Sequence, residues 1–522
     1  MHLMHRNLKL LSQCLLPNTA LYSMRCFMTK SSGTDQMEYL NSALEGKVID
    51  WPELKSKILN IQGILNEKNV DAVILKTMVR SRKLDLALSY SDYLKNSKTV
   101  LSIGVTNGIL NLYHQKARMN PLLESEREFI LKTYEELYDK YKVLDYTTAD
   151  SLLHALCAIN EWKKALRVLE DFKISSTPSH SAYSTLIGTL FKCNKDKEAL
   201  DIVRRSLADL RPLQHYAYKQ WIEYYQRKYK SKGTILKNLD KICSHISANF
   251  TVITKETADE IKNTYVSLGW KADYSKIIHD SGQCTSCDTY LNCLKISDEE
   301  FKLLQNDVKN KLIVGSDLFL KTSPKELSAF LKFVESTAPY DIVLDALNIA
   351  YAVRRGSHAQ KMSLLKTVVD HFDRKNKRIL LLGRKHMLTW HRKTLEYLTR
   401  RTCSFFTEDI SQDDPFFLTA AILSGPHTDI VSKDLLRGHR FILKDEQLKQ
   451  IFQRWQWQHQ WKVFTNRNTV VQPPLQYTPC AQKNKDGWHL PYEKINTEDK
   501  GYLHDGIPDY DSWLCLKSKL VR

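Results

Sequence analysis

The chain has 522 residues, of which 43% are hydrophobic. It has no apolar run near the roughly 18 residues that a membrane-spanning helix needs, which excludes an integral membrane protein built from such helices. Lys and Arg outnumber Asp and Glu by 77 to 59, which gives a net charge of +18 and suits a polyanionic partner, and this length supports two or three domains.

The first 34 residues differ from the rest in charge. They contain several Ser, Leu and Met residues, no acidic residue before Asp35, and four basic residues, Arg6, Lys9, Arg25 and Lys30. This composition is typical of a mitochondrial transit peptide, and polar residues interrupt the stretch 8–16 that would form the apolar core of a secretory signal. We therefore predict a transit peptide at 1–34 and a mature protein in the mitochondrial matrix.

A repeated pattern follows. When 151–169 is aligned with 185–203, the offset of 34 residues matches Leu152 with Leu186 and Asn160 with Asn194. A period near 34 with two amphipathic helices per unit indicates a helical-repeat solenoid. Weaker copies at 72–95, at 106–141 and from Tyr216 onward extend the predicted repeats over about 47–243. Protein-binding and RNA-binding repeats share this period, and the positive charge favours RNA.

Cysteine spacing indicates one metal-binding motif. Cys284 and Cys287 form a C-x₂-C knuckle, which supplies half of a tetrahedral zinc site. His489 in the segment GWHLP and Cys515 in the segment SWLCL could supply the other half, across a long intervening loop. A single C-x₂-C is a weak signal by itself. The other cysteines show no paired spacing and are expected to be thiols in a reducing compartment.

Four aspartates lie where apolar runs meet turns or helix starts: Asp345, the adjacent Asp413 and Asp414, and Asp434. Residues 342–344 are predicted to form a buried parallel strand, so Asp345 would lie at its carboxyl end, where open α/β sheets bind ligands. Further strands are predicted at 379–382, 405–406 and 430–431, with helices at 364–372 and 419–423. Carboxylates gathered at one sheet edge suit a hard cation such as Mg²⁺, and paired-metal sites cleave phosphodiesters.

Ordinary structural roles are open for the same aspartates. Asp414 precedes Pro415, and an Asp N-cap followed by Pro is a common helix start, although this does not account for Asp413. Asp434 follows a short strand and opens a predicted helix, where a carboxylate interacts favourably with the helix dipole. The joint order of strand then Asp, acidic pair opening a helix, and strand then Asp favours a metal site and hence a nuclease.

The segments DIVLDALNIAYA (341–352), DISQDDPFFLTAAILSG (409–425) and DIVSKDLLRGH (429–439) resemble the metallonuclease domain of protein-only ribonuclease P, a branch of the PIN-like nucleases. Within that family, the resemblance is to the animal mitochondrial members. Asn348 and His439 fall inside these motifs and are predicted to be neighbours of the site. The resemblance implies that catalytic Mg²⁺ or Mn²⁺ is held by Asp345, Asp413, Asp414 and Asp434.

The resemblance also implies a multidomain α plus α/β fold. It places a pentatricopeptide-type α-helical repeat solenoid at 47–243 and a PIN-like (NYN) α/β metallonuclease domain at 298–473. A zinc-binding central domain is split between 270–297 and 474–522. In the family this domain is closed by a structural zinc ion, which here implies the ligands Cys284, Cys287, His489 and Cys515.

The activity that the resemblance implies is endonucleolytic removal of the 5′ leader from precursor tRNA in mitochondria, leaving a 5′-phosphate on the tRNA. A tRNA methyltransferase and a short-chain dehydrogenase are the partner subunits expected by the same resemblance. Two alternatives stay open: a PIN-like endonuclease acting on other mitochondrial RNA, and a non-catalytic RNA-binding repeat protein. The repeats and the zinc motifs argue against the first, and the four carboxylates argue against the second.

Overall fold

The computed structural model describes residues 34–46, 49–97, 100–209, 211–293, 295–313, 323–353, 356–408, 414–432, 445–463, 471–493 and 512–518. The chain divides into two compact units, Met1–Leu200 and Asp201–Arg522. The predicted transit peptide lies outside the described residues, except for Thr34. Within the described residues, no helix is both long and apolar enough to cross a membrane.

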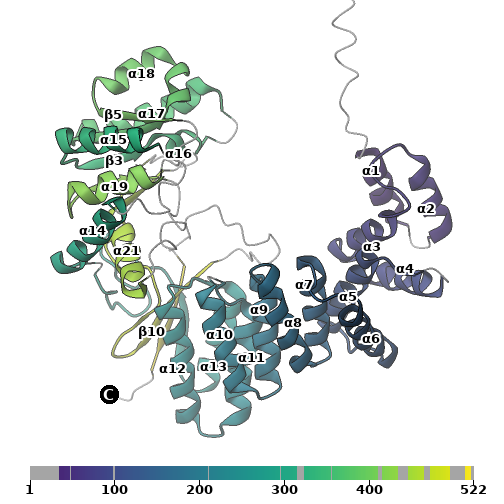
Figure 1. Cartoon of the computed structure of the whole chain (residues 1–522). Helices are drawn as coiled ribbons and strands as arrows, with labels where there is room; N and C mark the ends of the chain where they lie inside the picture. Colours follow the sequence, from purple (N-terminus) through teal and green to yellow (C-terminus); the bar gives the residue numbers. More distant parts are fainter. Residues whose placement is uncertain are drawn as a thin grey trace, which may run out of the picture. The chain divides into compact units, whose positions relative to one another are not determined.

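Every described element of the first unit is a helix (Figure 1). Short turns join the helices into hairpins, which is the architecture predicted from the repeat. The unit boundary falls inside the last of them. The helices are α1 (Thr34–Ala43), α2 (Trp51–Asn60), α3 (Val70–Arg80), α4 (Leu84–Asn96), α5 (Ile103–Ala117), α6 (Glu124–Lys140), α7 (Tyr146–Ala158), α8 (Trp162–Ser175), α9 (His180–Lys192) and α10 (Asp196–Ala208).

The predicted period of 34 residues is confirmed by the hairpins α7–α8 and α9–α10, whose first helices begin at Tyr146 and His180. Asn160 and Asn194, which the repeat aligns, both have a left-handed backbone, with φ of 62° and 59°. In each turn the residue after the asparagine donates its N–H to a carbonyl of the first helix, Glu161 to Leu156 and Lys195 to Leu190. Asn tolerates this conformation better than most residues, so its repetition identifies the hairpin turn.

The second unit continues with α11 (His215–Lys228), α12 (Lys232–Ala248) and α13 (Lys255–Ser267), followed by a small sheet. The sheet has the order β1 (Ile253–Thr254), β10 (Gly487–Glu493), β11 (Trp513–Lys517) and β2 (Lys271–Ser275), and β9 (Gln482–Lys483) also pairs with β10. Strands from two distant parts of the chain therefore share one sheet, and the chain between them forms a second sheet. Asp240 of α12 accepts a hydrogen bond from Trp488 Nε1 at 2.8 Å, which attaches the helix to the small sheet.

The second sheet is mainly parallel. Its order is β5 (Cys403–Thr407), β4 (Ile379–Arg384), β3 (Ile342–Asp345), β6 (Asp429–Val431), β7 (Gln460–Val463) and β8 (Val471–Gln472), and only the β7–β8 pair is antiparallel. The four strands predicted from the sequence are confirmed as β3, β4, β5 and β6. The short strands β7 and β8 were not predicted, because their mixed polar and apolar residues give no clear pattern.

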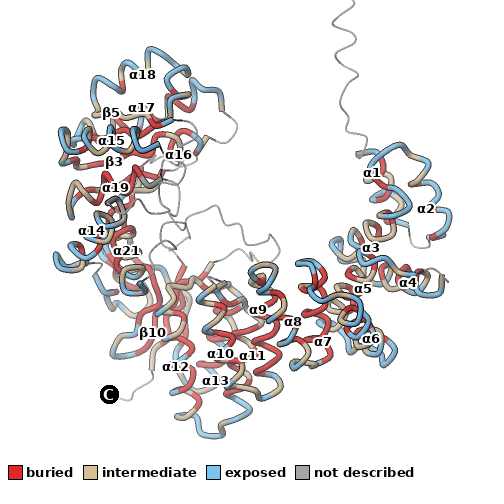
Figure 2. The backbone as a smooth tube through the Cα atoms, in the orientation of Figure 1, coloured by how far each residue is buried: buried red, intermediate tan, exposed pale blue. Residues whose placement is uncertain are grey.

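Helices cover both faces of the second sheet, and Figure 2 shows its strands buried between them. Successive residues of β3 point to opposite faces: Val343 packs in one apolar cluster with α14, α15, α19 and α21, and Leu344 packs in another with α16, α17 and α18. The predicted helices at 364–372 and 419–423 lie inside α17 and α19. The bounds are α14 (Asp298–Ile313), α15 (Pro324–Thr337), α16 (Ala346–Ala350), α17 (His358–Asp373), the 3₁₀ helix η2 (Lys385–Thr389), α18 (Arg392–Thr399), α19 (Asp414–Ser424) and α21 (Glu446–His459).

Candidate metal centres

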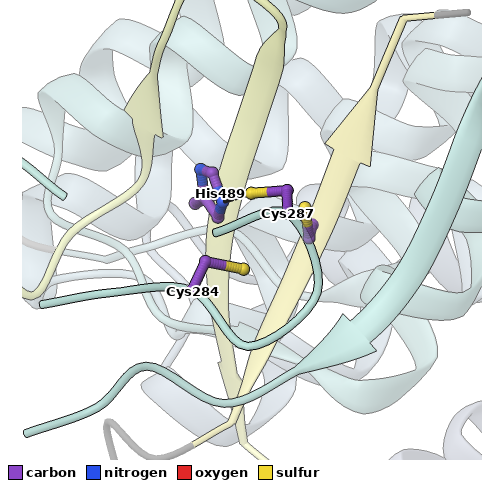
Figure 3. A group of neighbouring side chains, drawn as sticks. Cys284, Cys287 and His489 are labelled. Atoms are coloured by element: carbon purple, nitrogen blue, oxygen red, sulfur yellow. Dashed lines mark hydrogen bonds between the residues drawn. The ribbon is translucent and has the colours of Figure 1, made fainter. Parts of the chain in front are cut away.

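One candidate centre is a group of three cysteines and one histidine in the small sheet. Cys284 and Cys287 lie in the loop after β2, and His489 of β10 is the register partner of Cys515 of β11. The ligand atoms of the four residues all lie within 4.8 Å of one another. Figure 3 shows the two knuckle cysteines beside His489. The structure therefore brings together the four residues that the sequence singled out.

The contacts within this group fit a tetrahedral metal site. Cys287 Sγ lies 3.2 Å from His489 Nε2, and three of the four residues are buried. His489 Nδ1 is itself buried and has no hydrogen-bond partner among the described residues. Three sulfur donors and one imidazole in an apolar setting are the ligand set of a closed zinc site, in which no position is left for a reacting water.

Protons are shared unequally between two of the cysteines. A hydrogen bond from the Cys515 thiol, helped by one from His489, lowers the pKa of Cys284 to about 2 against the opposing effect of burial. The same hydrogen bond raises the pKa of Cys515 well above its usual range. The pKa shifts of the two residues therefore run in opposite directions and share one cause, the hydrogen bond between their sulfur atoms. Because zinc binds the thiolate form, a bound ion would displace the remaining proton.

Two glycines permit the close packing around this group. At Gly487 a Cβ would lie 1.8 Å from the carbonyl oxygen of Leu516, so no side chain can be accommodated where β10 starts against β11. Gly282, just before the knuckle, has φ of +73°, which L-residues with a side chain rarely adopt. The two glycines thus serve different needs: Gly487 provides space beside β11, and Gly282 provides a left-handed backbone before the knuckle.

A second candidate centre is built around Asp345, the last residue of β3. The residue is 3% exposed, and its Oδ1 accepts a hydrogen bond from the backbone N–H of Asn348 at 3.0 Å, which makes it the N-cap of α16. Its Oδ2 accepts from Asn348 Nδ2 at 2.5 Å and from Ser432 Oγ at 3.0 Å. These hydrogen bonds orient the carboxylate and compensate part of the cost of burying it.

Ser432 was missed by the sequence reasoning. It directly follows β6, the parallel neighbour of β3, and is fully buried. Its carbonyl oxygen accepts a hydrogen bond from Gln460 Nε2 at 2.8 Å, which ties it to β7. In the sequence Ser432 follows an apolar strand just as Asp345 does, and that position was the available signal.

The structure describes the remaining predicted site residues less completely than Asp345. Asp413, Asp434 and His439 lie outside the described residues, and for Asp414 the structure describes only the backbone. Because β5 and β6 are both parallel to the central strands, α19 connects the carboxyl edge of the sheet to the amino edge, so its first residue, Asp414, lies at the Asp345 edge. The helix starts one residue earlier than the N-cap alternative requires, a difference within the usual ambiguity of helix ends.

The fold and the two centres define a helical-repeat protein that carries an inserted parallel α/β domain and two candidate metal sites. Residues 278–515 match the family model of Protein-only RNase P. The chain is 30% identical over 402 residues to the mitochondrial ribonuclease P catalytic subunit of Mus musculus, an alignment that covers 75% of this chain and 67% of the mouse protein. The equivalent protein of Rattus norvegicus is 30% identical over 406 residues, with 75% and 66% covered. The chain belongs to the protein-only RNase P family of endoribonucleases.

The chain spans about two thirds of the length of these curated relatives, since 67% and 66% of them are aligned. Among solved structures, it is similar to nuclear proteinaceous RNase P 2 from A. thaliana, at 16% identity with TM-scores of 0.49 and 0.47, covering 87% of this chain and 100% of each solved chain.

Proposed function

We propose that this chain is the catalytic subunit of a mitochondrial ribonuclease P that removes the 5′ leader from precursor tRNA. The observation that carries the proposal is a buried, fully oriented carboxylate, Asp345, at the carboxyl end of the central strand in a member of this nuclease family. Cleavage would leave a 5′-phosphate on the tRNA and a 3′-hydroxyl on the leader.

Asp345, Asp413, Asp414 and Asp434 would hold the catalytic cation, which we propose to be Mg²⁺ or Mn²⁺. Carboxylate oxygens are the ligands these ions prefer, and when bound they supply an activated water and neutralise charge at the leaving oxygen. The chain's own contribution at Asp345 is orientation. Asn348 and Ser432 direct their donors at Oδ2, so the carboxylate is fixed before a cation or RNA arrives.

The Cys284, Cys287, His489 and Cys515 group would hold a structural Zn²⁺. Its ligands come from both chain segments that flank the second sheet, so a bound ion would cross-link the two ends of the inserted domain. The proposed role is stability of the small sheet, because a Cys₃His shell is already four-coordinate.

The setting of this activity is proposed from the named relatives and from the N-terminus. Residues 1–34 would direct the chain to the mitochondrial matrix. The substrate would be precursor tRNA, bound in part by the helical repeats. A tRNA methyltransferase and a short-chain dehydrogenase remain the predicted partner subunits.

A cleavage assay tests this proposal. Purified full-length chain is incubated with Mg²⁺ and a 5′-labelled precursor tRNA, with and without the two candidate partners, and an unfolded RNA of equal length is added as competitor at near-physiological salt. We expect one cut at the leader junction and weak competition. Equal competition, or cuts spread along both RNAs, would instead favour a general endonuclease.

A further inference from the structure

Aromatic and cationic side chains gather beside the carboxyl ends of β3 and β4. Tyr351 follows α16, which begins directly after Asp345, and Trp390 follows η2, which begins directly after β4. Since β3 and β4 are parallel neighbours, both segments leave the sheet at the edge that holds Asp345. At 1.5 Å of rise per residue, Tyr351 is about 9 Å along the chain's helical path from Asp345.

The rings are arranged around Trp390. His358 of α17 stacks on the indole, with ring centroids 4.7 Å apart and an interplanar angle of 7°. His386 and Tyr351 contact the same indole with centroid distances of 5.6 and 6.0 Å. Lys361 Nζ lies 3.7 Å from the centroid of the Tyr351 ring and 5.7 Å from that of Trp390. We call Tyr351, His358, Lys361, His386 and Trp390 the aromatic platform.

Lys361 is the residue of the platform that most needs an external partner. It is only 8% exposed, yet within the described part of the chain no carboxylate pairs with its ammonium group. Lys366 on the same helix offers the contrast, because it lies 4.3 Å over the Tyr397 ring but also pairs with Asp370 at 2.6 Å. An ammonium supported mainly by ring faces is under-compensated for its burial, and an anion would complete its environment.

The accessible surface and the charge around the platform suit RNA. Tyr351 is 47% exposed and His358 is exposed, so ring edges and faces remain reachable. The segments on the platform side of the two strands, 346–369 after β3 and 384–395 at the end of β4, supply all five residues and contain four Lys and Arg residues each and no Asp or Glu. Interleaved aromatic and basic residues are the composition of single-strand nucleic-acid sites.

We propose that the aromatic platform binds unpaired leader nucleotides next to the cleaved bond, with a phosphate on Lys361 and a base stacked on the exposed His358 ring, which Trp390 supports from its other face. Stacking on protein rings requires bases that are not already paired and stacked, and in the substrate of the proposed function, on which this inference rests, those beside the cut are the leader bases. The platform would hold the strand on the leader side while Asp345 and its neighbours act at the junction.

The test compares full-length variants, assembled with the partner proteins, on precursor tRNAs with a one-nucleotide leader and with a leader of roughly ten nucleotides. Trp390→Ala should raise the Kd of the long-leader substrate by roughly 5- to 100-fold, and Trp390→Phe should restore most of the affinity. Lys361→Met keeps the apolar stem, and it should weaken binding and reduce the slope of log Kd against log salt by about one. The matched control, Lys366→Met, should bind both substrates as wild type does.

Several outcomes would overturn the inference. If Trp390→Ala and Lys361→Met bind and cleave the long-leader precursor as wild type does, the platform is not a nucleotide site, and cleavage by wild type leaves the proposed function intact. If affinity falls equally for both leader lengths, the occupant is not the leader. If wild type does not cleave precursor tRNA but the two variants lose affinity for free single-stranded RNA, the proposed function fails while nucleotide binding at the platform stands.

Discussion

The two candidate centres of the second unit are built in opposite ways. The Cys/His group takes its ligands from a loop and two strands far apart in the sequence, and all four are described and lie within 4.8 Å. The Asp345 centre takes its predicted ligands from turns after strands of one sheet, and of these only Asp345 has a described side chain, held by Asn348 and Ser432. We call the Cys/His group the closed centre, because its four ligands complete a tetrahedral shell. We call the Asp345 site the open centre, because its carboxylate lies at the edge of a sheet.

This difference shows what each centre can do. At the closed centre, the free energy of metal binding contributes to the free energy of folding. Loss of a ligand there should therefore lower the stability of the chain. A carboxylate at the open carboxyl edge of a parallel sheet remains available to a cation and a substrate, so its loss is felt in rate. Measurements of stability and of cleavage rate should therefore distinguish the two centres.

The largest effect is expected at the closed centre. Cys284→Ser removes one of the three sulfur ligands of the group, so zinc binding should be lost and the small sheet destabilised by several kcal/mol. The measurement is zinc content by elemental analysis together with the thermal midpoint. Cys293→Ser, an exposed cysteine outside the group, is the control and should keep both. Stoichiometric zinc and an unchanged midpoint in Cys284→Ser would remove Cys284 from the ligand set.

The open centre should respond in rate alone. Asp345→Asn preserves volume and can still cap α16, because Asn is as good an N-cap as Asp. We expect the cleavage rate to fall by more than about 100-fold, beyond the loss typical of residues that only orient a ligand, while zinc content and RNA affinity stay near wild type. Normal cleavage at saturating Mg²⁺ would show that Asp345 acts only as a helix cap.

A smaller effect on the cleavage rate is expected at Ser432, which contacts the Asp345 carboxylate. Ser432→Ala removes the 3.0 Å hydrogen bond to Asp345 Oδ2 and leaves Asn348 in place. Cleavage should fall by roughly 10- to 100-fold and the Mg²⁺ concentration for half-maximal rate should rise. Ser432→Thr keeps the hydroxyl and should recover part of the rate. A Ser432→Ala protein with an unchanged Mg²⁺ dependence would limit Ser432 to packing.

The sequence was informative where local patterns determine structure. The strand before Asp345, the hairpin period, and the helices α17 and α19 follow from apolar spacing and turn residues, and all appear in the structure. The pairing of His489 with Cys515 depends on how β10 and β11 align. Only the fold determines that alignment. The sequence alone shows two separate short segments, GWHLP and SWLCL, and does not show that they pair.

Polar contacts between strands were the part that sequence reasoning missed. The position of Ser432 after an apolar strand was a weak signal, and its contact with Asp345 is recognised only when β6 is known to lie beside β3. The aromatic platform has the same origin, because Tyr351 and Trp390 are brought together by neighbouring strands rather than by spacing. The metal roles of Asp413, Asp414 and Asp434 stay predictions.

Buried histidines extend the comparison to the helical unit and give the smallest effect. His489 lies among thiols, whereas the ring of His154 in α7 contacts that of His114 in α5, with centroids 4.7 Å apart and planes tilted by 38°. Asp150 Oδ2 lies 3.6 Å from His154 Nε2. Burial, together with the positive charge of Arg118, lowers the pKa of His154 to about 4. Burial and the neighbouring His154 lower the pKa of His114 as well.

The sign of the effect follows from linkage. Between pH 6.5 and about 4, an unfolded chain binds a proton at His154 that the folded chain does not, so the free energy of unfolding falls as pH drops through this window. From pH 7 to pH 5 the loss from this residue should be about 1 to 2 kcal/mol, measured by urea unfolding of the full-length chain. His154→Gln, which cannot titrate, should show a weaker pH dependence by that amount, and exposed His427→Gln should behave as wild type. Equal pH dependence in wild type and His154→Gln would mean that His154 is protonated as easily in the folded chain as in the unfolded one, and that α5 and α7 open enough at pH 5 to hydrate it.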